Sequence, residues 1–167
     1  GLLSNGDKST GGIGIGVDAQ EEKSFLTLTQ VHEGKHLADG GKESIFIGWS
    51  FAKKLKIKVG DYVTVVVNTA EGSINALDLE VVGTFKSGVT QMDEGMYMIH
   101  YDTAKDLLGV TGSQRILIGF EDDDELRHQT KLNSFLAEKY PKLTAVHWQK
   151  LASYFDNTMG WLDSIFF

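Results

Sequence analysis

The chain has 167 residues, a formal net charge of −7 and no cysteine. This length suits one domain or two small lobes that share a core, and the lack of cysteine excludes disulfides, iron–sulfur clusters and thiol nucleophiles. A net charge of −7 counts against nucleic-acid binding, which needs clustered Lys and Arg, and against adhesion to an anionic bilayer through a polybasic patch.

Short strands and turns are predicted for the N-terminal part of the chain. Residues 1–12 are rich in Gly, Ser and Asn and are expected to form a loop. Residues 13–17 predict a strand with Gly at alternate positions, which indicates close backbone packing or an edge that another chain approaches. Residues 21–28 fit a helical turn and a strand equally well, and residues 37–41 predict a turn.

The clearest local pattern begins at residue 45. Residues 45–47 are apolar and predict a strand, and residues 49–55 predict a short amphipathic helix. Residues 59–61 predict a turn, because Gly60 can adopt backbone angles that other residues avoid and Asp61 can cap its own turn.

A hairpin and a strand–helix pair are predicted next. Residues 62–67 and 74–85 are predicted to pair as a hairpin closed around residues 71–72. Residues 95–100 then predict a strand, preceded by a loop, and residues 103–108 predict a short helix.

The C-terminal part predicts a β-α-β unit. Residues 115–120 and 143–147 have the pattern of strands, and residues 122–140 that of a helix, which Pro141 ends. The acidic run at 121–125 suits the start of this helix, where the helix dipole is positive.

These elements together predict an α+β fold with mixed or antiparallel sheets and short helices. We expect a single domain over residues 1–167, with a β-rich lobe at 1–112, the β-α-β lobe at 113–147 and a last amphipathic helix at 148–167.

One short motif matches a zinc-protease signature. His32, Glu33 and His36 fit the pattern H-E-x-x-H, in which two imidazoles one helical turn apart bind zinc and the Glu activates water. Gly34 lies inside the required helix, and a turn is predicted directly after His36, so a surface loop is the preferred interpretation and a zinc hydrolase the weaker alternative.

No cofactor site is predicted. Residues 14–19 match G-x-G-x-x-A, but a dinucleotide site requires a strand before this pattern, and the preceding residues predict a loop. The chain has no phosphate-binding G-x-x-x-x-G-K-[ST] motif, so an ATPase would have to be a separate chain. We therefore expect no catalytic residue in this chain.

Apolar residues in two places are candidates for partner contact. Met92 lies in a predicted loop, and Met side chains adapt to varied partners. Trp161, Ile165 and Phe166 give the terminal helix more apolar surface than a solvated end requires, which suits a membrane-proximal stalk or a partner helix.

Six blocks occur in the order typical of one family, the extracytoplasmic domains of ABC-transporter permeases of the FtsX and MacB type. The blocks are Gly16-Val17-Asp18-Ala19 with Glu22, Glu33-Gly34-Lys35-His36-Leu37, residues 45–61, Val81-Val82-Gly83-Thr84-Phe85-Lys86-Ser87-Gly88 with Asp93, residues 102–108, and Trp148. The chain resembles this family, which includes lipoprotein-releasing permeases, over nearly its whole length. It departs from the pattern at Ala19, where Pro is common, and at Phe51, where Leu is common.

The resemblance implies a MacB-like periplasmic core domain on the outer side of the bacterial inner membrane. It implies a non-catalytic part that transmits ATP-driven motion to lipoprotein release or a related export, with macrolide or peptide efflux as an alternative. The implied partners are an ABC ATPase subunit, a second permease copy or paralogue, and a periplasmic carrier or adaptor.

The resemblance also implies a membrane-spanning helix before residue 1 and another after residue 167. The loop between residues 67 and 74, which is long and recruits the carrier in one lipoprotein-releasing subunit, is short here.

Overall fold

The computed structural model describes residues 1–21, 29–113, 115–120 and 125–147. The chain divides into two compact units, residues 1–115 (unit 1) and 116–167 (unit 2). The division falls close to the predicted lobe boundary after residue 112. The last helix predicted, at 148–167, and residues 22–28 lie outside the described residues.

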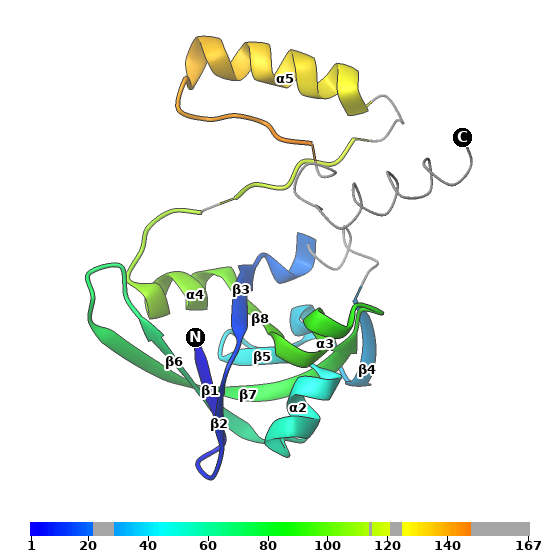
Figure 1. Cartoon of the computed structure of the whole chain (residues 1–167), viewed down its shortest axis with the longest axis vertical. Helices are drawn as coiled ribbons and strands as arrows, with labels where there is room; N and C mark the ends of the chain where they lie inside the picture. The colour runs from blue at the N-terminus through cyan, green and yellow to red at the C-terminus, as the bar shows by residue number, and fades with distance from the viewer. Residues whose placement is uncertain (22–28, 114, 121–124, 148–167) are drawn as a thin grey trace, which may run out of the picture. The chain divides into compact units, whose positions relative to one another are not determined.

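Unit 1 is built on an eight-stranded mixed sheet (Figure 1). The strands are β1 (Leu2–Ser4), β2 (Ser9–Gly11), β3 (Ile13–Val17), β4 (Gln30–Gly34), β5 (Ser44–Gly48), β6 (Tyr62–Asn68), β7 (Ile74–Lys86) and β8 (Met96–His100). The predicted α+β class, with a mixed sheet and short helices, is confirmed.

Four short helical elements of unit 1 have both ends within the described residues. They are the 3₁₀ turn η1 (Leu37–Asp39) and the helices α2 (Trp49–Leu55), α3 (Thr90–Gly95) and α4 (Tyr101–Leu108). The predicted bounds of β3 and α2 agree with the structure, and those of the β6–β7 hairpin agree to within one residue at each end. Helix α3 was not predicted, because a loop was expected before β8.

The strand order is β2-β1-β6-β7-β5-β8-β3, so the path begins and ends on consecutive strands. Gly12 alone separates β2 from β3, and its N–H and C=O both bond to Gly1 at 2.9 Å. β2 pairs with β1 while β3 pairs with β8 in parallel. The sheet therefore curls until its two ends meet on one continuous segment.

Strand β7 organises this sheet because it changes partner along its length. Its first half pairs with β6 and its last four residues pair with β4, both antiparallel. β5 pairs with β7 in parallel from Glu80 to Phe85. One long strand thus joins the hairpin to β4 and β5.

Two hydrophobic cores form on the two faces of β5. Ile45 and Ile47 belong to the larger core, which also draws on β1, β6, β7, β8, α2 and α4. Phe46 points the other way and packs with Phe85 and Met98 in the smaller core, as expected from the alternation of side chains along a strand. All five residues of β5 are buried.

Residues 1–12 form a hairpin rather than the predicted loop. Leu3 is fully buried and pairs with Val65 of β6. The turn is organised by Asn5, whose side-chain Oδ1 accepts hydrogen bonds from the N–H groups of Asp7 and Lys8 at 3.1 and 2.8 Å. Tertiary pairing therefore overrides the loop-like composition.

Unit 2 contains the helix α5 (Glu125–Lys139), which confirms the predicted helix. The two strands predicted beside it, at 115–120 and 143–147, are not formed within the described residues. The Ala145 N–H donates to Asn133 Oδ1 at 2.8 Å, and the Ala145 C=O accepts from the amides of Gln129 and Asn133 at 3.1 Å. Side chains of α5 thus satisfy the backbone N–H and C=O of Ala145, so these two groups need no partner from a neighbouring strand.

None of the helices in the described part of the chain is long and apolar enough to cross a membrane.

Candidate interaction site

A cluster of side chains joins three elements of unit 1 where β7 ends. Trp49 is the first residue of α2, and Asp93 lies in α3. Lys86 is the last residue of β7, and Ser87 follows it. We call these four residues the Trp49 cluster. Its members come from two of the blocks that carry the family resemblance, residues 45–61 and residues 81–88 with Asp93.

Asp93 is the buried centre of the cluster, with 8% of its surface exposed. Its Oδ1 accepts hydrogen bonds from the N–H and Oγ of Ser87 at 2.7 and 2.8 Å, and its Oδ2 accepts one from Trp49 Nε1 at 3.1 Å. Hydrogen bonds to a carboxylate are about twice as strong as neutral ones. Asp93 therefore fixes α2, α3 and the end of β7 to one another.

Backbone packing brings α3 close to β5 at the same place. A Cβ built on Gly48 would come within 2.8 Å of the Asp93 carbonyl carbon and 2.9 Å of the Met92 oxygen. Gly48 permits this approach because it has no side chain. Met92, one of the predicted contact residues, is thereby held beside the Trp49 cluster and is half-buried rather than exposed.

The outer face of Trp49 is covered by polar groups. The Lys86 ammonium lies 4.8 Å from the centre of the indole ring, a cation–π contact. The His32 ring meets Trp49 edge-on, with 5.7 Å between ring centres. Trp49 is half-buried, so part of its surface still faces solvent.

A shallow pocket of about 420 Å³ opens beside the cluster, lined by Gln30, Trp49, Lys86, Ser87, Gly88 and Asp93. It offers an ammonium, an amide and an aromatic surface. These groups suit binding of a polar segment through hydrogen bonds and stacking. The Asp93 carboxylate also lines the pocket, but it already accepts hydrogen bonds from three donors of the protein.

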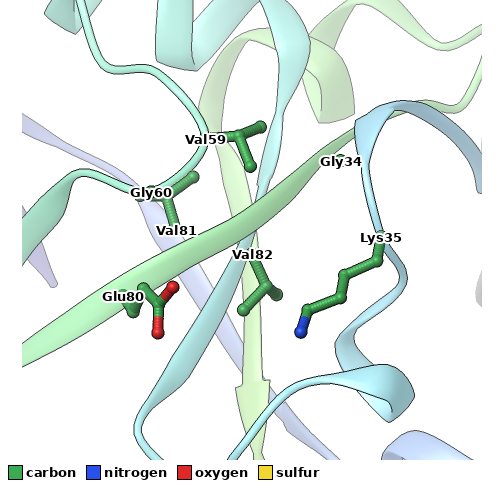
Figure 2. Close-up of a pocket in the computed structure, with 7 residues that line it drawn as sticks. All are labelled: Gly34, Lys35, Val59, Gly60, Glu80, Val81 and Val82. Atoms are coloured by element: carbon green, nitrogen blue, oxygen red, sulfur yellow. The ribbon is translucent and has the colours of Figure 1, made fainter.

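A second depression, of about 250 Å³, lies where β7 passes from β6 to β4. Figure 2 shows its lining residues, which come from the end of β4, the turn before β6, and β7. The Val81 N–H donates to Asp61 O and the Val81 C=O accepts from Gly60 N, at 2.9 and 2.8 Å. The backbone N–H and C=O of Val81 are therefore already paired. The depression marks the junction of β4, β6 and β7, which we call the seam, and the Val81 backbone offers no free group there to a ligand.

Two motif glycines meet at this seam. Gly34 of β4 is paired with Gly83 of β7, and a Cβ on Gly83 would collide with Lys35 O and lie 2.8 Å from Glu33 O. Gly34 has a φ of 75°, in the region that favours glycine. The blocks around Glu33 and Val81 thus contain glycine where two strands approach closely.

The zinc-protease motif does not lie on a helix. His32 and Glu33 are in β4, and His36 precedes η1, where its Nδ1 accepts the Ala38 N–H at 3.2 Å. His36 is buried and packs against Phe46, with 5.2 Å between ring centres. The described residues contain no group of three His, Cys, Asp or Glu side chains placed to hold a metal.

The glycines of the G-x-G-x-x-A pattern pack against neighbours in the sheet. Gly14 lies under the ring of Tyr97, which a Cβ would approach to 2.5 Å, and Gly16 lies against Ala104. This contact is the close backbone packing predicted from the alternate glycines.

The Trp49 cluster was not predicted as a site. Of the residues that were, Met92 lies next to it, whereas Trp161, Ile165 and Phe166 lie outside the described residues. The available signal was that Trp49 stands in one block of the spaced pattern, and Ser87 and Asp93 in another. Sequence alone did not show that these blocks meet.

Comparison with known proteins does not assign the chain to a family. No protein-family model matches it, and no curated protein matches it significantly.

Proposed function

We propose that this chain is the extracytoplasmic domain of an ABC-transporter permease of the FtsX and MacB type. In this role the chain catalyses no reaction. It transmits motion driven by a separate ATPase subunit to the release or export of a lipoprotein or a related substrate, acting beside a second permease copy or paralogue.

The observation that carries this proposal is the meeting of separate sequence blocks. The Glu33 block packs on the Val81 block through Gly34 and Gly83, and the block with Trp49 is tied to Asp93 by a hydrogen bond of 3.1 Å. Residues that recur in a fixed order are thus the residues that lock neighbouring elements together. This agreement between the order of the blocks and the contacts within this chain supports the proposal.

A mechanical role fits the construction of unit 1. Its sheet curls until its ends meet, two hydrophobic cores cover the faces of β5, and Asp93 links two helices to the end of β7. Packed elements of this kind move as rigid bodies, whereas a loosely joined domain would absorb a displacement. The Trp49 cluster supplies a surface for a periplasmic carrier, an adaptor or a second copy.

The location can be tested because the chain has no cysteine. Glu71 is exposed at the tip of the β6–β7 hairpin, so a Glu71→Cys variant of the full-length protein carries one accessible thiol in this domain. We expect a membrane-impermeant maleimide to label this residue in cells whose inner membrane is intact and whose outer membrane has been made permeable. Labelling that requires lysis of the inner membrane would overturn the proposal. The full-length parent protein, in which this domain has no cysteine, is the matched control.

The same proposal predicts the protein around this segment. The full open reading frame should encode one hydrophobic span before residue 1 and another after residue 167. A reading frame with no such spans would leave the domain with nothing to move it.

A further inference from the structure

Four lysines gather at the end of α2 and in the turn that follows. Lys53, Lys54, Lys56 and Lys58 are all exposed, whereas Leu55 and Ile57 between them are buried. The alternation of exposed lysine and buried apolar residue makes these four side chains a projecting row. We call them the α2 lysine ridge.

In the described part of the chain, the carboxylates of Glu94 and Asp61 lie at this ridge, and Asp61 Oδ2 accepts the Lys58 N–H at 2.8 Å. Lys54 Nζ lies 2.8 Å from Glu94 Oε2, and within the described residues this is the one ion pair that involves a ridge lysine. Lys53 and Lys54 also stabilise the end of α2, because cations favour the negative end of a helix dipole. That role does not extend to Lys56 and Lys58, which lie beyond the helix.

Lys56 stands in a conformation that favours glycine. It has φ 57° and ψ 36°, and it is the only non-glycine residue with positive φ in the described part of the chain. The residue after a helix often adopts this conformation and is usually Gly. A lysine here is less stable than a glycine would be, so its presence at the centre of the ridge points to a use for its charge.

The ridge is positive even though the chain is not. The four lysines lie within six residues of a chain whose net charge is −7. At physiological salt, exposed charges more than about 8 Å apart are largely screened from one another. A surface that approaches the ridge therefore meets the local positive charge, and the argument from net charge against bilayer adhesion does not apply to this face.

The shape and chemistry of the ridge suit an anionic membrane surface. Neither of the two depressions described above is lined by a ridge lysine. Lysines are flexible point charges, whereas specific recognition of a carboxylate favours the planar fork of arginine. Val59 and Tyr62, which follow the ridge, are 40% and 66% exposed. A tyrosine beside lysines is typical of the boundary between lipid and water.

We propose that the α2 lysine ridge docks unit 1 onto the anionic phosphates of a phospholipid bilayer. The inference goes beyond the proposed function, because it concerns which surface of unit 1 contacts the bilayer and not which subunit drives its motion. Each lysine near an anionic bilayer contributes about fivefold in partitioning. Two lysines together are therefore expected to contribute about 25-fold.

Vesicle binding by the 167-residue chain tests this proposal. The probes are phosphatidylcholine vesicles with and without phosphatidylglycerol, at low salt, and the charge-dependent part of binding is the difference between them. The test variant is Lys53→Gln with Lys58→Gln. The matched control is Lys35→Gln with Lys42→Gln, which removes two exposed lysines elsewhere and changes the net charge equally.

We expect the ridge variant to lose about 25-fold of its binding to the anionic vesicles and the control to lose much less. Lys56→Gly should lose about fivefold while its melting temperature stays equal or rises, which separates the loss of charge from a loss of folding. Equal binding of the wild-type chain to both vesicle types would overturn the proposal.

Equal losses in the ridge and control variants would also overturn it. Tighter binding to soluble polyglutamate than to the anionic vesicles would overturn it in favour of an acidic protein partner. None of these results depends on flanking membrane spans, so failure here and failure of the proposed function can be told apart.

Discussion

Substitution of Gly83 by alanine tests whether two of the sequence blocks are locked together. The added Cβ would collide with Lys35 O and would lie 2.8 Å from Glu33 O and 2.9 Å from Lys35 N. All three atoms belong to the backbone of β4 and the residue after it. Because a backbone cannot rotate away as a side chain can, β4 must move off β7.

The size of the effect follows from the contacts that this movement breaks. Overpacking in a tight interior costs about 1–3 kcal/mol. Displacing β4 also weakens the hydrogen bond from Lys35 N to Val82 O, which is 2.9 Å long, and each such bond contributes about 1 kcal/mol. We therefore expect Gly83→Ala to lower the free energy of unfolding by about 3 kcal/mol.

Urea unfolding followed by far-UV circular dichroism measures this loss. Gly41→Ala is the control, because Gly41 is exposed and a Cβ there would meet nothing within 4 Å. The control should be unchanged or stabilised by up to about 1 kcal/mol. A loss of less than about 1 kcal/mol in Gly83→Ala would show that the strands are not held in contact as described.

Four further results are expected. Asp93→Asn should destabilise unit 1 by about 2 kcal/mol in urea, because one amide cannot accept all three hydrogen bonds; an unchanged midpoint would contradict this. Burial raises the pKa of Tyr97 above its usual value of 10.0, so the folded state holds this proton more tightly and stability should fall as pH rises above that value. Tyr97→Phe should remove this alkaline loss, and an identical pH profile would refute the cause. Lys56→Gly should stabilise by about 0.5–1 kcal/mol in thermal melts, since relief of the left-handed conformation exceeds the entropy cost of Gly; a lower melting temperature would count against it. Metal analysis should find no zinc bound through His32 and His36, which lie in a strand and before a 3₁₀ turn; one zinc per chain would revive the hydrolase alternative.

Local patterns predicted the middle of unit 1 well. The apolar strand β5, helix α2 and the turn at Gly60 each carry their own signal, and Lys58 N–H donates to Asp61 Oδ2 at 2.8 Å as a self-capping turn requires. The signals are strong here because each depends on neighbours within a few residues.

Elements fixed by distant partners were missed. β1 has three residues, and it is a strand because Leu3 fills the core beside β6, which no local pattern reveals. In unit 2 the opposite error occurred. The apolar alternation at Ile116 and Ile118 predicted a strand, yet these side chains are exposed and the segment is irregular within the described residues.

The candidate site could be predicted only in part. The blocks that contain Trp49, Ser87 and Asp93 were visible in the sequence, but Trp49 and Asp93 are 44 residues apart. Their hydrogen bond depends on β5, β8 and the end of β7 lying side by side. Such convergence is a property of the sheet order, which the local patterns do not contain.

We propose that ATP drives this domain as a rigid lever, and distances between spin labels on the full-length protein test this proposal. Spin labels on Glu71→Cys in two copies report movement between domains, and labels on Glu71→Cys and Lys42→Cys within one copy report the shape of unit 1. We expect the first distance to change between the nucleotide-free and ATP-bound states while the second stays constant. An unchanged distance between the copies, or a change within unit 1 alone, would contradict it.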